Sequence, residues 1–315
     1  MQIRYILIII LFSPIRLISQ IGLANHYPTL KPHHILDENK EDISFAFSMR
    51  ILESDVDYLI RLRRDSDDAE QDFGCNEDDL LDVTAINTWA GASTLYVVTW
   101  YDQSGQGRNA VQTDPDKQPV FTPDTTFPYF NSDDVEDFLV VETSTLTLTN
   151  NGKNGTVIGV FYATDNNNHT FGTRQRTNGG NRWLAHFNWS DNNLYFDPSN
   201  VNGSRNIGNT VNIDVWNQYS LIRRDDPGNP ATDRRIFRIN NTEIQNLGYN
   251  DAFQHTGDYY FGIGATIAST ITSANPYDTF QHSTTRFCEF IMYAEGKDDS
   301  FLNEIEENQI TYWNL

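Results

Sequence analysis

The chain lacks the residue patterns that mark several common classes of protein. Only 2 of its 315 residues are cysteine. Two cysteines cannot build a zinc cluster alone, and they allow one disulfide at most. No P-loop, dinucleotide-binding glycine fingerprint, His-Glu-x-x-His or Gly-x-Ser-x-Gly motif occurs. We therefore predict neither a cofactor nor a dedicated metal site, and the sequence leaves open whether Cys75 and Cys288 pair.

Basic residues are scarce as well. The chain has 22 lysines and arginines against 43 aspartates and glutamates, a formal net charge of −21. A surface of this sign repels the phosphates of nucleic acids and of anionic membranes. The composition therefore excludes a nucleic-acid partner and suits neutral or cationic ones.

Long hydrophobic runs are also missing, apart from one near the N-terminus. The run Ile6–Phe12 follows a single early arginine and ends before Pro14 and Arg16. It is too short for a membrane span, which takes about 20 residues. A charged start and a short apolar core are typical of a signal peptide. We expect cleavage after Ser19 or, with better small-residue spacing, after Ala24.

These features divide the chain into three parts. We predict a signal peptide over residues 1–24, a polar irregular lead-in over 25–41 and one β domain over 42–315. The remaining length suits a single β-sandwich, since such domains often exceed 200 residues. The mature protein is expected to be secreted, either extracellular or periplasmic, with no membrane span.

What the chain has in abundance is short β-type segments. Runs rich in β-branched and aromatic residues recur between clusters of Asn, Asp, Gly and Ser, which predicts an antiparallel all-β sandwich. The clearest runs cover residues 43–49, 58–63, 95–100, 138–141, 156–162, 219–223, 235–239, 259–264 and 287–293. Two helices are predicted, a short internal one over 77–88 and a C-terminal one over about 298–313.

The segment after one of these strands has an unusual pattern. Residues 99–109 read Thr-Trp-Tyr-Asp-Gln-Ser-Gly-Gln-Gly-Arg-Asn. An aspartate here accepts backbone N–H groups two residues on, and the glycines permit a sharp reversal. Two interpretations stand: Asp102 forms the turn while Trp100 fills the core, or Tyr101, Asp102 and Gln103 contact a sugar.

This run resembles the catalytic domain of the glycoside hydrolase family 54 α-L-arabinofuranosidases (arabinofuranosidase B). It also resembles the wider group of concanavalin A-like, laminin-G-like jelly rolls. The resemblance extends from about residue 43 to residue 293. It implies a two-sheet antiparallel jelly-roll sandwich, here with a short internal helix and a C-terminal helix, and it implies a protein that handles sugars.

The resemblance also assigns site residues. In the stretch 190–195, Asp191 stands at the family's nucleophilic glutamate and Asn192 at the asparagine after it. Trp189 takes the place of a second pocket aspartate. In 261–266, Thr266 stands where the family has its acid/base aspartate. Retaining hydrolysis needs two carboxyl groups about 5–5.5 Å apart, and a threonine cannot supply a proton near neutral pH.

Other interpretations of the same residues stay open. The segment 183–197 is also typical of a hairpin with Ser-Asp-Asn-Asn as its turn, so Asp191 is a turn former, a catalytic carboxylate, or a ligand for metal or sugar. Trp183 and Trp189 stack on sugar rings or pack in the core. Glu289 either replaces the missing acid/base residue or is a paired or solvent-facing glutamate.

The loop 133–137 carries four carboxylates. Oxygen-rich loops bind calcium, but the spacing of an EF-hand is absent, so the loop is expected to be a solvated acidic loop.

We therefore expect a secreted carbohydrate-recognition protein that binds a plant or algal polysaccharide. The first alternative is an active retaining glycosidase that releases arabinose, with Asp191 as nucleophile and Glu289 as acid/base. The second is an adhesion or surface protein. The sequence does not indicate an oligomeric state.

Overall fold

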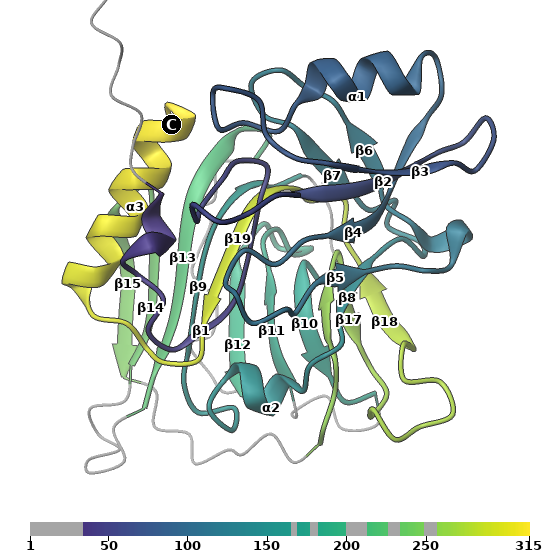
Figure 1. Ribbon diagram of the computed structural model, residues 1–315. Coiled ribbons are helices and arrows are strands. Elements are labelled where there is room, and N and C mark those ends of the chain that lie inside the picture. Colours follow the sequence, from purple (N-terminus) through teal and green to yellow (C-terminus); the bar gives the residue numbers. More distant parts are fainter. Residues whose placement is uncertain (1–33, 165–168, 177–181, 200–212, 226–233, 249–256) are drawn as a thin grey trace, which may run out of the picture. The chain divides into compact units, whose positions relative to one another are not determined.

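Figure 1 shows the chain as a computed structural model, which describes residues 34–164, 169–176, 182–199, 213–225, 234–248 and 257–315. Nineteen strands and three α-helices form within these ranges, and the strands pair almost entirely antiparallel. One pair, β10 with β17, runs parallel. The prediction of an all-β sandwich is confirmed.

The elements follow one another without a long helical connection. The helical elements are η1 (Ile35–Asp37), α1 (Val83–Ala90), η2 (Pro115–Lys117), α2 (Thr145–Leu148) and α3 (Asp299–Trp313). The strands are β1 (Ile43–Ser48), β2 (Ile60–Arg64), β3 (Glu70–Phe73), β4 (Leu95–Trp100), β5 (Ala110–Val111), β6 (Val120–Thr122), β7 (Tyr129–Asn131), β8 (Leu139–Val141), β9 (Gly155–Tyr162), β10 (Phe171–Arg174), β11 (Arg182–His186), β12 (Tyr195–Ser199), β13 (Trp216–Arg224), β14 (Arg234–Ile239), β15 (Thr242–Gly248), β16 (Phe261–Ile263), β17 (Ala265–Ile267), β18 (Thr279–His282) and β19 (Arg286–Tyr293).

The strands at the centre of the molecule are buried on both faces. β9 pairs with β13 on one side and β19 on the other, and β1 pairs with β19. Successive side chains of a strand point to opposite faces. Phe161 therefore joins the main core with Phe290, while Ile158 and Ile291 join a second cluster under α3. This two-sided burial explains why these runs are almost continuously apolar.

The C-terminal helix is confirmed at nearly the predicted bounds. Asp298 caps α3, since its carboxylate accepts the backbone N–H of Phe301 at 3.0 Å. Leu302 and Ile305 are fully buried against the sheet. Figure 1 shows α3 lying along β13 and β14.

The internal helix starts later than the sequence pattern predicts. The expected helix covered 77–88, but α1 begins at Val83, with Asp82 accepting the N–H of Ala85 at 2.9 Å. Leu80 forms a bridge to Arg50, and Asp79 has a positive φ of 58°. The acidic residues taken for a first helical turn therefore belong to the preceding turn.

Part of the predicted lead-in packs with the domain. Ile35 and Leu36, in η1, are completely buried in the cluster under α3. The predicted signal peptide and the first part of the predicted lead-in lie outside the described residues. Within the described ranges, no helix combines the length and the apolar character that a membrane crossing requires.

Candidate functional site

The stretch that the sequence marked for sugar contact forms a hairpin. β11 and β12 pair from Arg182 opposite Ser199 to His186 opposite Tyr195. The chain reverses at Asn192, whose φ is 60°, and the Trp189 N–H donates to the Asn193 carbonyl at 3.0 Å. The prediction of a hairpin is confirmed.

The two faces of this hairpin differ in character. Trp183 points inward, is completely buried, and packs against Phe196 and Phe261 with ring centroids 5.4 and 6.1 Å away. Gly155 lies directly under its ring, so even a Cβ at that position would approach the ring to 2.9 Å. Trp183 therefore fills the core and offers no platform to a sugar in this structure.

The opposite face carries a group of polar side chains that we call the hairpin face. It comprises His169, Arg174, Arg182, His186, Asp197 and Thr266. The Arg182 guanidinium lies 3.2 Å from Asp197 Oδ2, and His186 Nε2 lies 3.8 Å from the same oxygen. The His169 and His186 rings are 4.3 Å apart. All of these side chains except Arg174 are more than nine-tenths buried, so the charged, donor and acceptor groups are concentrated in one small and largely covered area.

Aromatic rings border the hairpin face. Trp189, which is only half-buried, lies 4.6 Å from the His186 ring and 6.1 Å from the His169 ring. On the other side, the Arg174 guanidinium lies 4.0 Å from the centre of the Phe280 ring. Rings beside donors and acceptors are the elements from which sugar-binding sites are usually built, because they present an apolar body next to polar groups.

Asp191 sits at the exposed tip of the hairpin. Its carboxylate accepts the Tyr195 hydroxyl and, at 3.2 Å, the Asn193 N–H. These hydrogen bonds hold the pKa of Asp191 below its usual value, with the Tyr195 bond as the largest cause. Asp191 is therefore an ionised carboxylate with a fixed orientation, and Asn192 beside it supplies the left-handed residue of the turn.

Thr266 lies on β17, facing His169. Its hydroxyl is 2.7 Å from His169 Nδ1, and both side chains are completely buried. The neighbouring Ala265 and Ile267 point the other way, into a small apolar cluster. The position that the family resemblance gives to an acid/base carboxyl group therefore holds a hydroxyl paired with an imidazole.

Tyr101, Asp102 and Gln103 lie in a different part of the fold. Asp102 accepts the backbone N–H groups of Ala46, Ser104 and Arg108 at 2.8–2.9 Å. These bonds tie the turn to β1, as the turn-former interpretation expects. Gln103 is 1% exposed.

Both polar atoms of the Gln103 amide form hydrogen bonds with the backbone. Its Oε1 accepts the Leu52 N–H at 2.8 Å, and its Nε2 donates to the Arg50 carbonyl at 2.9 Å. Tyr101, Asp102 and Gln103 all line a surface hollow of about 270 Å³, together with the half-exposed Tyr58. The Tyr101 hydroxyl donates to Asp72 at 2.6 Å.

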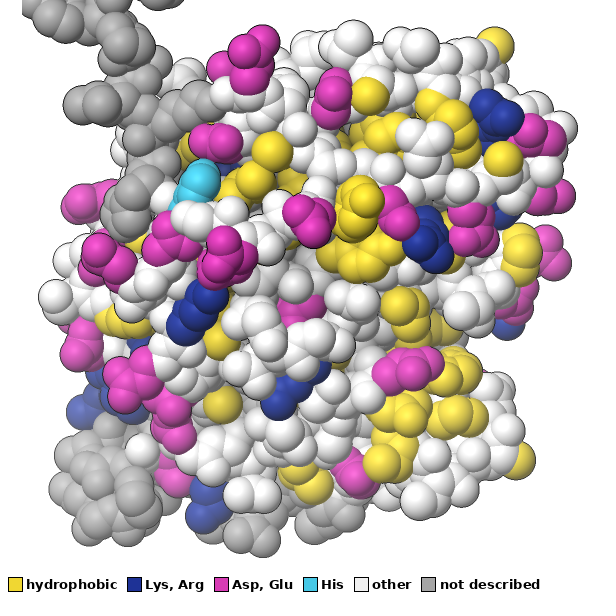
Figure 2. Space-filling view, in the orientation of Figure 1, with side chains coloured by type: hydrophobic (Ala, Val, Ile, Leu, Met, Phe, Trp, Pro, Cys, Tyr) yellow, Lys and Arg dark blue, Asp and Glu magenta, His cyan; other side chains and the backbone are white. Residues whose placement is uncertain are grey.

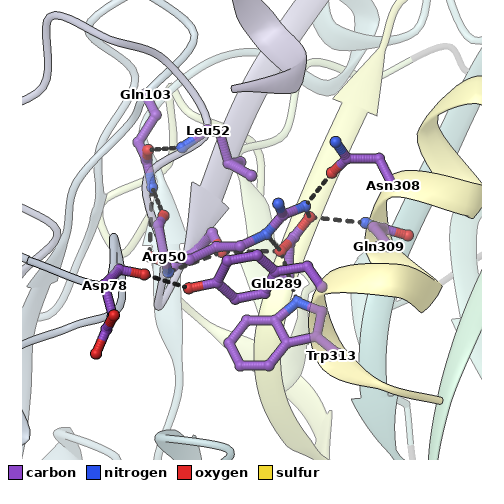
Figure 3. Close-up of polar contacts among 10 residues, drawn as sticks. Arg50, Leu52, Asp78, Gln103, Glu289, Asn308, Gln309 and Trp313 are labelled. Atoms are coloured by element: carbon purple, nitrogen blue, oxygen red, sulfur yellow. Dashed lines mark hydrogen bonds and ion pairs between the residues drawn. The ribbon is translucent and has the colours of Figure 1, made fainter. Parts of the chain in front are cut away.

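Glu289 is enclosed by its partners (Figure 3). It is completely buried and forms an ion pair with Arg50, whose Nε lies 2.7 Å from Glu289 Oε2. Gln309 and Trp313, both on α3, donate to its two oxygens at 3.0 and 2.9 Å. Burial alone would raise the pKa of Glu289, but the charge of Arg50 and these hydrogen bonds lower it. In this geometry Glu289 attaches α3 to β19 and has no open approach for a substrate.

The structure thus separates the predicted site residues into groups. Trp189, Asp191 and Asn192 lie together with His186, whereas Trp183, Glu289 and the Tyr101–Gln103 run lie elsewhere. The sequence interpretation missed His169, Arg174, Arg182, Asp197 and Phe280. Part of the signal was present: polar residues alternate at 182 and 186 on one strand and at 195 and 197 on the next, which is typical of a strand pair with a polar outer face.

Comparison with known proteins gives similarity at the level of the fold. No sequence-family profile matches the chain, and no curated protein sequence matches it. A solved arabinofuranosidase complexed with arabinofuranosyl-α-1,2-xylobiose matches with a TM-score of 0.59 and 15% identity, over 85% of this chain and 62% of that one. A family 54 α-L-arabinofuranosidase soaked with a cyclic sulfate inhibitor gives the same values.

A mutant of a family 54 α-L-arabinofuranosidase, soaked with 4-nitrophenyl α-L-arabinofuranoside, matches with a TM-score of 0.57 and 14% identity, over 86% of this chain and 63% of that one. The chain spans less than two thirds of the length of these enzymes. At this identity the likeness concerns the fold alone. The chain has a β-sandwich that resembles the domain of the family 54 α-L-arabinofuranosidases.

Proposed function

We propose that this protein is a carbohydrate-recognition module that binds a plant or algal polysaccharide on the hairpin face. The observation that carries the proposal is the polar group around His186 and Asp197, which is bordered by the half-exposed Trp189. The proposal includes export of the mature chain, which the N-terminal sequence favours.

The chemistry of the hairpin face suits a neutral sugar. The half-buried Arg174 supplies donors and the exposed Asp191 supplies acceptors, while Arg182 and Asp197 are buried and pair with each other. Hydroxyl groups of a sugar satisfy both donors and acceptors. The indole of Trp189 provides an apolar surface of the kind on which the C–H face of a sugar ring stacks. These features favour recognition of an uncharged polysaccharide over binding of an anionic one.

The same residues favour recognition over hydrolysis. Retaining hydrolysis requires a proton donor about 5–5.5 Å from the nucleophile. Thr266 offers a hydroxyl, and Glu289 is held ionised by Arg50 inside the core. Of the two predicted catalytic carboxylates, Asp191 and Glu289, only Asp191 is exposed.

A retaining glycosidase is the second candidate. It is favoured by the fixed, ionised carboxylate of Asp191 at the position of a family nucleophile. In that case, another group on the hairpin face would have to donate the proton. An adhesion role without sugar specificity is the third candidate.

The test is a panel of arabinan, arabinoxylan and algal polysaccharides, on which retention and sugar release are both measured with the purified mature protein. We expect retention of at least one glycan with millimolar-to-micromolar affinity and no release. Glu38→Gln is the control, because Glu38 is exposed and far from Asp191 in the sequence. Sugar release that disappears in Asp191→Asn but persists in Glu38→Gln would establish the glycosidase instead. Absence of retention across the panel would remove the proposal.

A further inference from the structure

A second polar surface is formed by other strands and loops than those of the hairpin face. It is a groove of about 850 Å³ formed by β2, β3, β4, β6, η2 and the loop between β7 and β8. Its charged lining consists of six carboxylates and one guanidinium: Asp65, Asp68, Glu70, Asp116, Asp133, Asp137 and Arg63. Figure 2 shows that acidic side chains are also spread over the visible face of the molecule, where basic ones are fewer.

The guanidinium of Arg63, which lines the groove, already has partners within the protein. Arg63 is 7% exposed, and its Nη1 lies 2.7 Å from Asp68 Oδ1, while its Nε donates to Gln118 at 2.7 Å. The same group stacks 4.7 Å from the centre of the Tyr96 ring. Arg63 therefore neutralises one carboxylate and leaves the others without a cationic partner from the groove lining.

Asp137 is the unusual member of this group. It is only 7% exposed and lines the groove, yet no hydrogen bond to its carboxylate occurs among the described residues. Its own backbone N–H donates to Asp133 Oδ1 at 3.1 Å, which places a second carboxylate next to it. A buried carboxylate without a partner is costly, and it is normally paired with a cation or a donor.

The nature of the missing partner follows from the geometry. Within the described ranges, no three acidic, histidine or cysteine side chains converge closely enough to hold a metal ion. The carboxylates are instead distributed along the groove, next to the aromatic ring of Tyr96. Separated negative charges match separated positive charges.

We propose that this groove binds an extended organic polycation, a chain of spaced primary ammonium groups, with one of them paired to Asp137. Two sources share this chemistry: a linear polyamine and an oligomer of an amino sugar. The inference stands independently of the proposed function, because it rests on different strands and loops.

Isothermal titration at pH 7 and low salt tests the proposal, with spermine as one probe and a glucosamine tetramer as the other. Asp137→Asn removes the charge while keeping the size of the side chain, and we expect it to weaken binding at least tenfold. Glu38→Gln is the matched control, since Glu38 is exposed and lies outside the groove lining; its effect should stay below twofold.

The neutral N-acetylglucosamine tetramer serves as the uncharged ligand. Tighter binding of spermine identifies the polyamine class, and tighter binding of the glucosamine tetramer identifies the amino-sugar class. The proposal is overturned if neither probe binds, if the acetylated tetramer binds equally well, or if Asp137→Asn and Glu38→Gln have equal effects. Thermal denaturation of both variants without ligand shows whether each one is folded.

Discussion

Arg50 and Glu289 form an ion pair that is closed to solvent, with side chains 1% and 0% exposed and a shortest N–O distance of 2.7 Å. The pair joins the bridge residue after β1 to β19, and Glu289 also accepts hydrogen bonds from two residues of α3. One carboxylate therefore joins the segment after β1 to β19 and α3, which lie at the other end of the sequence.

Glu289→Gln should lower the free energy of unfolding by about 3–5 kcal/mol, because it leaves the Arg50 charge buried without its counter-ion. Urea denaturation measures the change. The matched control is Asp67→Asn, which breaks the more exposed pair with Arg64 and should cost much less, because solvent screens exposed charges. Full stability of Glu289→Gln together with loss of sugar release would instead assign Glu289 to catalysis.

Thr266→Val keeps the shape of the side chain but removes the hydroxyl that pairs with His169. We expect a loss of about 1–2 kcal/mol in stability and a clear loss of glycan affinity. Thr285→Val is the control: Thr285 is also buried, and its hydroxyl bonds to Ser283 at 2.9 Å, away from the hairpin face. Equal affinities of the two variants would contradict a role of Thr266 in the site.

Much of this architecture could be predicted, because its cause is local. Alternating apolar residues at 43–49 and 156–162 specify strands, and the capped, amphipathic 298–313 segment specifies a helix. The start of α1 could not be predicted from helical pattern alone, since Leu80 and Leu81 take part in bridges to Arg50 and Cys75. Such long-range pairing overrides a local preference.

The candidate site was predicted only in part, for a similar reason. The hairpin turn at Asp191 is local, so its residues were found. For Glu289 the sequence left open an acid/base residue and a paired or solvent-facing glutamate, and the structure makes it a paired one. Its partner Arg50 is 239 residues away in the sequence, and the α3 residues that cover it are 20 and 24 residues away. Only the folded chain brings them together.

The acidic groove makes the stability of the protein depend on pH. Burial, together with the charges of Asp133 and Glu136, raises the pKa of Asp137 to about 7. The folded state therefore binds this proton more tightly than the unfolded state, so Asp137 contributes stability at low pH that is lost as the pH rises from about 4 to 7. The charged or titratable groups around it are Arg63, Asp68, Glu70, Asp116, Lys117, Asp133, Asp134, Glu136 and His282.

Asp137→Asn should remove this dependence. Between pH 5 and pH 8 the wild type is expected to lose about 1–3 kcal/mol more stability than the variant, since one pKa unit corresponds to about 1.4 kcal/mol. Urea denaturation at the two pH values measures the difference, with Glu38→Gln as the control. Parallel pH profiles for wild type and Asp137→Asn would contradict the burial argument.

The most direct measurement for the central claim is the affinity of Trp189→Ala for the glycan that the wild type retains best. Trp189 borders the hairpin face. The matched control is Tyr58→Ala, because Tyr58 is an exposed aromatic ring that lines the separate surface hollow next to Tyr101. We predict at least a tenfold loss of affinity for Trp189→Ala, no sugar release, and an unchanged affinity for Tyr58→Ala. Retained affinity in Trp189→Ala, or a loss confined to Tyr58→Ala, would contradict glycan recognition on the hairpin face.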